Sequence, residues 1–490
     1  MRVNAADGRA RWSALLILCL GTLMIVLDTT IVNVALPTIK RSLGFSASSL
    51  AWVVNGYLLT FGGFLLLGGR LGDIFGPRRM FIGGIALFTL ASLGCGLADS
   101  QGLLVAARLI QGFGGATVSA VSLALTMALF VEDADRAKAM GIFGFVAAGG
   151  GTVGVLAGGV LTDLLSWHWI FLVNVPIGVC VCLLGLRLLP AGSRNAGQKL
   201  DVGGAVCVTA ALMLAVYAIV NGNQAGWTSA QTLGLLGGAV VLLAAFLTIE
   251  SRVPSPLMPL GLFRSRNLAT ANGLGVLWAG ALFAWFFLVA LYLQIVLGYS
   301  PLKVGLAFLP ANLIMGALSI GVSALLVMRF GLKRPLAAGL ALACAGLLLF
   351  ARVPVHGSFA ADILPPMILL GLGGGIVFNP LLLAAMGDVE PSDAGLASGL
   401  VNTAFMMGGA LGLAILASVA ASRTSSLLAS HDSQAVALVG GYHIAFMIGA
   451  GFALIACVGA LVGLRAHTTV PAAALASAPH AGETVAEPIP

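Results

Sequence analysis

The chain has 490 residues, of which 59% are hydrophobic and only 8% charged, and its mean hydropathy is +1.07. A soluble globular domain carries about 25% charged residues, so this composition excludes a water-soluble protein and indicates one that is surrounded mostly by lipid. The net charge of +7 is compatible with nucleic-acid binding, but the basic residues are dispersed between apolar runs and form no patch for it. The seven Cys lie inside apolar runs, and we interpret them as packing residues rather than as disulfides or metal ligands.

Fourteen apolar runs follow one another along the chain, each long enough to cross about 30 Å of hydrocarbon as a helix. The predicted spans are 13–36, 49–69, 79–97, 102–127, 138–161, 168–189, 200–221, 231–249, 268–296, 301–327, 335–353, 361–385, 396–420 and 442–464. The first span follows three Arg residues and resembles a signal peptide, but no small-residue cleavage site comes after it, so we expect it to be retained. The sequence therefore predicts an all-α integral membrane protein with 14 transmembrane helices.

The basic residues between the spans give the orientation. If the N-terminus is cytoplasmic, 18 of the 24 Lys and Arg residues fall in cytoplasmic segments, 5 in outer loops and 1 inside a span. Cytoplasmic loops of membrane proteins carry such an excess of positive charge. The distribution predicts that both termini are cytoplasmic.

The chain also repeats itself weakly. Gly76-Pro77-Arg78-Arg79 follows span two and Gly331-Leu332-Lys333-Arg334 follows span ten, and the glycines Gly84 and Gly339 keep the same offset of 255 residues. The stretches "QGFGGA" (111–116) and "LGLGGG" (370–375) match at an offset of 259 residues. Spans 1–6 and 9–14 thus form two related halves around two inserted spans, a build typical of transporters that alternate access to a central site.

These patterns predict five segments. They are a cytoplasmic N-terminus (1–12), an N-terminal six-helix half (13–189), a linker with two extra transmembrane helices (190–261), a C-terminal six-helix half (262–465) and a disordered cytoplasmic tail (466–490).

Two charges lie well inside predicted spans, Asp28 in "LDTTIVNVALP" (27–37) and Arg108 in span four. Because span one runs outward and span four inward, both residues fall about 10–12 Å from the outer ends at 1.5 Å per residue, so they can share one layer. Intramembrane charges are costly and commonly functional, and a carboxylate that gains and loses an Arg partner can carry a proton. Two other interpretations remain, that Arg108 extends to the outer interface and that the two charges form a static pair that fixes helix register.

Several motifs resemble those of a known family. The loop "GGRLGDIFGPRRMFIGG" (68–84) matches G-x-L-x-D-x-x-G-R-[RK], and span four matches R-x-x-x-G through Arg108 and Gly112. Span five, "GGTVGVLAGG" (150–159), matches G-x-x-x-G-P-x-x-G-G except for Val155 in place of proline. With "LDTTIVNVALP", these motifs make the chain similar to the fourteen-span drug/proton antiporters of the major facilitator superfamily, over roughly residues 13–465.

The resemblance implies the major facilitator fold and a role for each motif. It implies proton coupling by Asp28 and Arg108. It implies a conformational latch formed by Gly69, Asp73, Gly76, Arg78 and Arg79, in which we expect Gly69 and Gly76 to permit tight turns and close helix approach and Asp73 to pair with a partner or cap a helix. It implies a helix-packing face formed by Gly150, Gly154, Gly158 and Gly159, although the absence of proline at position 155 leaves the bend that is associated with antiport in doubt.

The function predicted from these features is proton-coupled efflux of hydrophobic or amphiphilic small molecules, such as drugs and antibiotics, across a bacterial cytoplasmic membrane. We expect a monomeric transporter rather than an enzyme, driven by the proton gradient without a cofactor, since no GxxxxGK[ST] loop for ATP is present. Its expected partners are the substrate, protons and the lipid bilayer. The candidates for the substrate cavity are Asn33, Trp278, Trp285, Phe286, Met406 and Met407. An uncoupled facilitator or lipid flippase of the same fold, and a membrane sensor that transports nothing, are the alternatives.

Overall fold

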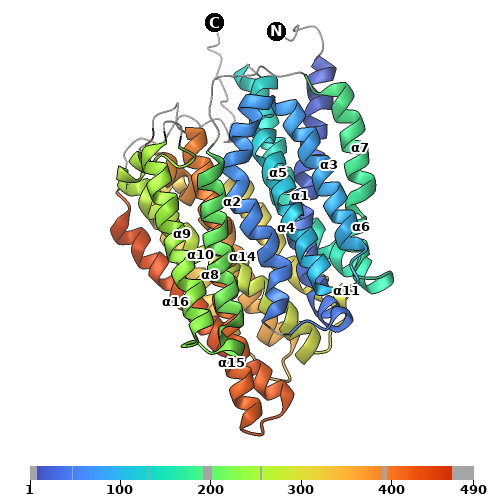
Figure 1. Ribbon diagram of the computed structural model, residues 1–490, viewed down its shortest axis with the longest axis vertical. Coiled ribbons are helices and arrows are strands. Elements are labelled where there is room, and N and C mark those ends of the chain that lie inside the picture. The colour runs from blue at the N-terminus through green and yellow to red at the C-terminus, as the bar shows by residue number, and fades with distance from the viewer. Residues whose placement is uncertain are drawn as a thin grey trace, which may run out of the picture.

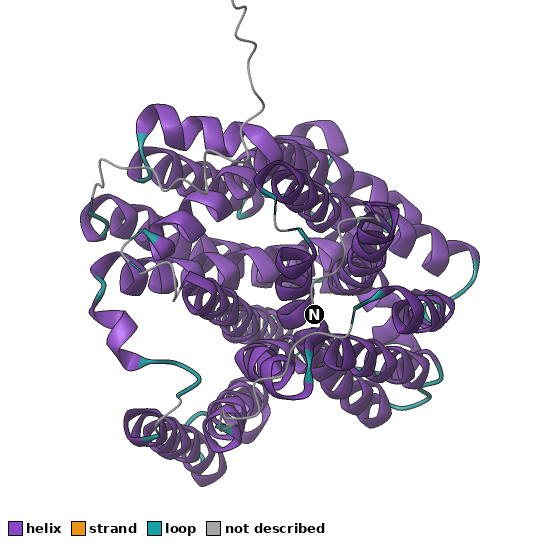
Figure 2. Cartoon of the chain, turned by 90° about the horizontal axis from the view of Figure 1, so that it is seen from above, coloured by secondary structure: helices purple, strands orange, loops and turns teal. Residues whose placement is uncertain are grey.

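The computed structural model describes residues 8–46, 48–130, 132–190, 201–253, 256–387, 389 and 394–465. These residues form helices joined by short loops, without a strand among them (Figures 1 and 2). In this part of the chain, 13 helices are long and apolar enough to cross a membrane. The fourteenth crossing, from Pro301 to Phe330, is divided into three consecutive helical pieces, so the predicted 14 spans are all present. The predicted tail, 466–490, lies outside the described residues.

The helices of the N-terminal half and the inserted pair follow the predicted spans closely. They are α1 (Gly8–Leu43), α2 (Trp52–Phe75), α3 (Pro77–Gly96), α4 (Gln101–Leu129), α5 (Asp133–Leu164), α6 (Trp169–Leu172), α7 (Asn174–Leu188), α8 (Val202–Ala225) and α9 (Ala230–Arg252). α6 and α7 together make the predicted sixth span. A short 3-10 turn, η1 (Ser49–Ala51), precedes α2.

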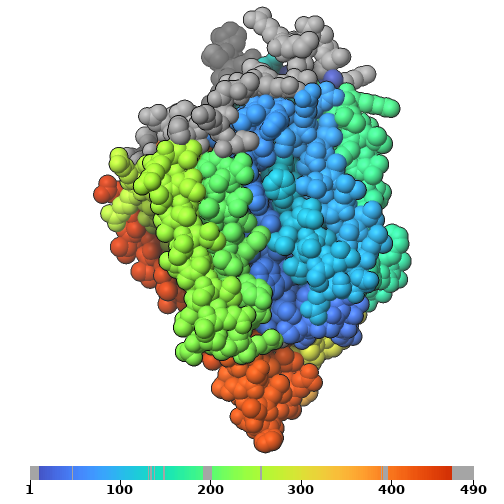
Figure 3. Space-filling model, in the orientation of Figure 1, coloured from blue at the N-terminus to red at the C-terminus, as the bar shows by residue number. Residues whose placement is uncertain are grey.

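The C-terminal half is interrupted more often. It consists of α10 (Arg266–Leu291), η3 (Tyr292–Val296), α11 (Pro301–Ala317), η4 (Leu318–Val322), α12 (Ser323–Phe330), α13 (Lys333–Phe350), η5 (Phe359–Ile363), α14 (Leu364–Met386), α15 (Ala394–Ala429) and α16 (Gln434–Gly463), after the 3-10 turn η2 (Leu260–Arg264). η3, η4 and η5 are single π-helical turns. α1 and α15 have 36 residues each and exceed their predicted spans, because helices continue into water beyond the apolar window. The polar tip joining α15 to α16 projects from the end of the molecule opposite to the start of α1 (Figure 3).

The helix contacts repeat between the two halves. In the N-terminal half, α4 packs on α2 and α3, α1 packs on α5, and α7 packs on α3 and α1. In the C-terminal half, α14 packs on α11 and α13, α10 packs on α15, and α16 packs on α13 and α10. The two halves then meet through the equivalent pairs α5–α11 and α2–α15. The weak sequence repeat therefore corresponds to one packing pattern used twice.

Glycines form the same close crossing in each half. A Cβ atom on Gly84 or Gly114, where α3 crosses α4, would lie 3.1 or 3.0 Å from the carbonyl oxygen of the other glycine. In the crossing of α13 and α14, a Cβ atom on Gly339 or Gly373 would lie 3.1 or 2.7 Å from the corresponding oxygen. Small residues permit this backbone approach, and dispersion between close helices replaces the hydrophobic effect as the attraction within a bilayer. The motif glycines thus fix the distance between the helices that carry the polar side chains.

The inserted helices α8 and α9 pack on each other and cover one side of the molecule, where α8 contacts both α2 and α15 (Figures 1 and 3). Asn223 of α8 donates from Nδ2 to the carbonyl oxygen of Ser418 in α15 at 2.7 Å and contacts its hydroxyl at 2.9 Å. α8 approaches α2 closely at Thr209, because a Cβ atom on Gly63 of α2 would lie 2.0 Å from Oγ1 of Thr209. The inserted pair therefore lies over the α2–α15 contact between the two halves.

The glycine crossing makes a stability prediction. Replacing Gly114 with Ala should lower the melting temperature of the purified protein in detergent, because the new methyl group would lie 2.8 Å from the backbone nitrogen of Phe88 and overpacking costs about 1–3 kcal/mol. Gly102→Ala in the same helix is the matched control, since a Cβ atom there meets nothing within 4 Å. Equal melting temperatures for the two variants would show that α3 and α4 can separate without cost.

Candidate functional site

Asp28 of α1 and Arg108 of α4 form an ion pair in the interior of the N-terminal half. Their side chains are 0% and 1% exposed, and Nη1 of Arg108 donates directly to Oδ2 of Asp28. The predicted common depth of the two residues is therefore confirmed, and Arg108 does not extend to the outer interface. A buried charge is tolerated only when it is paired and hydrogen-bonded, which makes this pair the centre of the candidate site.

Two amide side chains complete the surroundings of the Asp28 carboxylate. Gln111 of α4 donates from Nε2 to Oδ1 of Asp28 at 2.7 Å, and Asn174 of α7 donates to the same oxygen at 3.4 Å. Both amides are buried. Both oxygens of the Asp28 carboxylate therefore have donors, Oδ1 from the two amides and Oδ2 from Arg108.

The Gln111 amide has one orientation that satisfies all its groups. Besides its bond to Asp28, Nε2 donates to Oγ of Ser92 in α3 at 2.8 Å, while Oε1 accepts from Nη1 of Arg108 at 2.7 Å. Exchanging the amide oxygen and nitrogen would place an oxygen against the Asp28 carboxylate. Gln111 therefore bridges the acid and the base of the pair and ties both to α3.

Arg108 has partners that do not depend on Asp28. Its Nε donates to the carbonyl oxygen of Val53 in α2 at 2.9 Å, and its guanidinium lies 4.4 Å from the ring centroid of Tyr57 and 5.6 Å from that of Phe171. Aromatic faces attract a cation, more strongly where water is excluded. The site thus draws on α1, α2, α3, α4, α6 and α7, and the guanidinium keeps several favourable contacts if the carboxylate is neutralised.

The sequence did not single out Gln111, Asn174, Ser92 or Tyr57. Gln111 carried a local signal, because it lies three residues after Arg108 and so on the same face of the helix. Asn174 lies 146 residues from Asp28, and no local pattern links the two.

The glycines of α5 support the helix that carries Asp28. Cβ atoms on Gly150, Gly154 and Gly158 would meet α1, and the one on Gly154 would lie 3.0 Å from the carbonyl oxygen of Leu27. Gly159 instead faces α11, where its Cβ atom would lie 3.0 Å from Cα of Leu302. The predicted packing face is thus present, and it joins α5 both to α1 and to the other half. Val155 is buried within the continuous helix α5.

The loop between α2 and α3 matches its predicted role only partly. Gly76 has φ of 95° and makes the turn, as expected, and Arg78 donates from its guanidinium to the carbonyl oxygen of Leu186 in the last turn of α7. The expectation for Gly69 was wrong, because it lies inside α2 and a Cβ atom there would meet nothing within 4 Å. Asp73 and Arg79 are exposed, and Asp73 has no hydrogen bond or ion pair to any residue that the structure describes.

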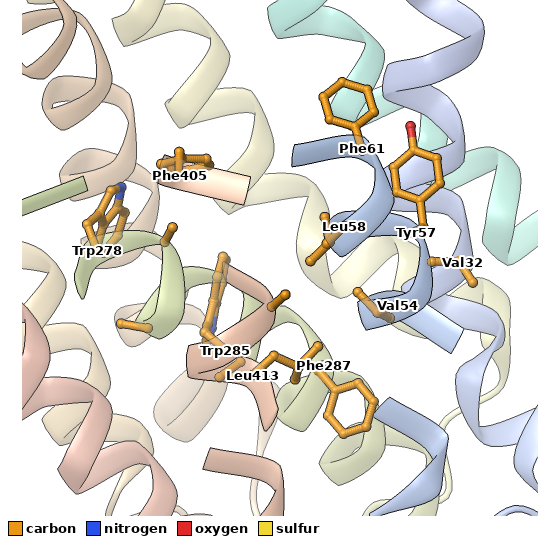
Figure 4. Packing of buried hydrophobic residues seen from close by; sticks show 14 of the residues in the cluster. Val32, Val54, Tyr57, Leu58, Phe61, Trp278, Trp285, Phe287, Phe405 and Leu413 are labelled. Carbon is orange, nitrogen blue, oxygen red and sulfur yellow. The ribbon is translucent and has the colours of Figure 1, made fainter. Parts of the chain in front are cut away.

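The predicted cavity residues fall into three environments. Asn33 is 4% exposed and bonds to the carbonyl oxygen of Thr29 in its own helix at 3.2 Å. Trp278 and Trp285 are buried in α10 among apolar side chains of both halves (Figure 4), and Nε1 of Trp285 has no partner among the described residues. Phe286 is half-buried and stacks on Phe308 at 5.4 Å between ring centroids.

Met406 and Met407 lie where α15 meets α2, at 3.0 and 3.1 Å from a Cβ atom built on Gly62. A separate aromatic group joins three helices, with Phe405 of α15 at 6.0 Å from Phe283 and 5.7 Å from Phe378. The buried ion pair of Asp28 and Arg108 thus lies in the N-terminal half, and this aromatic group lies in the C-terminal half. Within the described residues, no group of three His, Cys, Asp or Glu side chains is placed to hold a metal ion.

Known proteins resemble this chain over most of its length. The family model of the Major Facilitator Superfamily matches residues 18–413. The puromycin resistance protein pur8 of Streptomyces alboniger is 39% identical over 469 residues, which cover 94% of this chain and 92% of that protein. The cephamycin export protein CmcT of Amycolatopsis lactamdurans is 40% identical over 445 residues, covering 89% and 91% of the two chains.

Solved structures share the fold at low sequence identity. A bacterial homologue of the human lysosomal transporter Spinster has a TM-score of 0.65 at 16% identity and covers 96% of this chain and 97% of its own. The xylose transporter XylE from E. coli has a TM-score of 0.60 at 15% identity and covers 94% and 97%. The family model, the relatives and the helix arrangement agree, and this chain belongs to the Major Facilitator Superfamily as a multi-pass transporter of the cell membrane, not an enzyme.

Proposed function

We propose that this chain exports hydrophobic or amphiphilic small molecules, antibiotics among them, in exchange for protons. The observation that carries the proposal is the fully buried Asp28–Arg108 pair, which lies within membrane-spanning helices. The relatives named for puromycin resistance and cephamycin export support the direction of transport and the type of substrate.

Asp28 is the proposed proton carrier. Protonation removes its negative charge and weakens its bond to Arg108, while the contacts of Arg108 with Val53, Tyr57 and Gln111 remain. Without such contacts, neutralising one member of a buried pair would leave the other as an uncompensated charge at a cost of roughly 3–5 kcal/mol. The pair can therefore alternate between charged and neutral acid without unfolding the site. Protonation from outside would favour the return of the transporter to its inward-facing state, and proton release inside would reset it.

The proposed substrate path lies between the halves. The aromatic side chains of the C-terminal half, Phe283, Phe286, Phe378 and Phe405, offer apolar contacts of the kind that line sites for drug-sized ligands. The loop from Asp73 to Arg79 is the proposed inner latch, with Arg78 anchoring it to α7. One chain provides all these parts, so the proposal requires no second copy.

An uncoupled facilitator or lipid flippase of the same fold is the alternative that Val155 favours, because α5 lacks the proline of the antiporter motif. A sensor that transports nothing is the third possibility. Uptake into inside-out vesicles with and without an imposed proton gradient separates the three, because only the antiporter accelerates with the gradient and the sensor moves no substrate.

The first functional prediction concerns the carboxylate. Asp28→Asn should abolish gradient-driven accumulation of an exported antibiotic in inside-out vesicles, because an amide cannot take up and release a proton at physiological pH. Exchange of labelled for unlabelled antibiotic without a gradient should persist, since that exchange requires only the alternation of the loaded transporter.

Retained exchange also serves as the control that the variant is folded. Gradient-driven accumulation at the level of the unmodified protein in Asp28→Asn would refute the proton role of Asp28 while leaving export itself intact.

The second functional prediction concerns Gln111. Gln111→Leu should lower the rate of gradient-driven export about tenfold, because Asp28 loses its 2.7 Å donor and Arg108 loses the amide oxygen that it contacts at 2.7 Å. Ser92→Ala removes only the hydrogen bond from the same amide to α3, at 2.8 Å, and should lower the rate less. Equal rates for the two variants would show that Gln111 does not act through its bonds to the ion pair.

A further inference from the structure

One hydrogen bond joins the two six-helix halves directly within the part of the chain that the structure describes. Gln294, in the π-helical turn η3 after α10, donates from Nε2 to the carbonyl oxygen of Val34 in α1 at 2.6 Å. Other close contacts between the halves are between small or apolar groups, such as Gly159 with Leu302. A directional polar bond at this position is therefore a distinct feature of the interface.

The bond lies toward the predicted outer ends of both helices. Val34 follows Asp28 by six residues, which is about 9 Å along α1. On the other side, Tyr292 fixes the start of the π-turn because its hydroxyl donates to the carbonyl oxygen of Pro354 at 2.7 Å. This π-turn ends the helix, and its Gln294 side chain bonds to the opposite half.

The Gln294 amide is only half satisfied in this conformation. Its Oε1 atom is buried and has no hydrogen-bond partner among the described residues. A buried acceptor without a donor destabilises the closed conformation, because it has lost the hydrogen bonds that water would make with it. Opening the contact would hydrate both ends of the amide, so the closed arrangement is only slightly favoured by this side chain. Such a bond suits a contact that forms and breaks during a transport cycle better than one that stabilises the fold.

We propose that Gln294 is an outer-gate residue, whose amide holds the π-turn against Val34 when the outer entrance is closed and releases it when the entrance opens. Because Val34 and Asp28 are on the same helix, a movement of α1 at the ion pair reaches the gate directly. The proposal rests on the proposed export function only in requiring that the protein opens outward, and it does not depend on proton coupling.

The chain offers a matched control. Gln101, in α4, donates from Nε2 to the carbonyl oxygen of Leu43 at the end of α1 at 3.0 Å. This is the same type of bond to the same helix near its outer end, but both partners belong to the N-terminal half. Removing it should weaken local packing without affecting the contact between the halves.

The test measures access from outside in whole cells. Thr29→Cys places a half-buried thiol one to two turns inward of Val34, and its labelling by a membrane-impermeant maleimide reports how often the outer entrance is open. Adding Gln294→Leu should raise the labelling rate, but by less than the roughly fivefold that corresponds to about 1 kcal/mol for one ordinary hydrogen bond, because the unpaired Oε1 atom already offsets part of the bond. Adding Gln101→Leu should leave the rate unchanged. The same proteins without the Thr29→Cys change give the background from native thiols.

Gln294→Glu is the second variant. It keeps the size of the side chain, but its carboxylate cannot donate to Val34, so it should raise labelling as well, even if Gln294→Leu folds poorly. Equal labelling in all variants, an equal rise with Gln101→Leu, or a fall with Gln294→Leu would overturn the gate. Labelling requires neither transport nor a proton gradient, so loss of this contrast alongside intact gradient-driven export would refute the gate alone.

Discussion

The ion pair between Asp28 and Arg108 imposes the strictest constraint on this structure. Two charges removed from water lose hydration free energy that only close pairing and further hydrogen bonds offset. The site meets that requirement with donors from α4 and α7 for the carboxylate and with an acceptor and two aromatic rings for the guanidinium. While both groups are charged, the helices that supply these partners are therefore held in fixed positions relative to one another.

Close backbone approach makes that arrangement possible. Gly56 lies beside Arg108, and a Cβ atom on Gly112 would lie 2.4 Å from the carbonyl oxygen of Tyr57, so α2 and α4 meet with almost no side-chain volume between them. The antiporter-type glycines of α5 similarly bring that helix against the Leu27–Ile31 segment of α1. Glycine at these positions is thus a condition for the charge network, because larger residues would separate the helices beyond hydrogen-bonding distance.

The sequence predicted the features that follow from solvation and chain periodicity. Apolar runs and the charge distribution gave 14 crossings, and the two intramembrane charges at matching depths predicted a pair that the structure contains. The amides of Gln111 and Asn174 could not be predicted in the same way, since a neutral polar residue within an apolar helix gives no charge signal and the pairing with Asp28 depends on tertiary contacts. The π-turns and the extra length of α1 and α15 were not predicted either, because an apolar window detects neither a change of helix type nor the continuation of a helix beyond the apolar residues. For Gly69 the motif predicted a tight turn and a close helix approach, but the residue lies within α2 and the structure shows no close contact there.

The two halves share one packing pattern but differ in their polar and aromatic side chains, and α1 links the ion pair of one half to the other half. The crossings of Gly84 with Gly114 and of Gly339 with Gly373 are equivalent, yet the buried ion pair occurs in the N-terminal half, while Phe283, Phe378 and Phe405 form their group in the C-terminal half. α1 carries Asp28, packs on α5 and α7 in its own half, and contacts α10 and α11 in the other. A change of charge at Asp28 therefore acts on the same helix that bonds to the opposite half through the Val34 carbonyl oxygen. This geometry gives a short physical route, about 9 Å along a single helix, from the protonation of one carboxylate to the contact between the two halves.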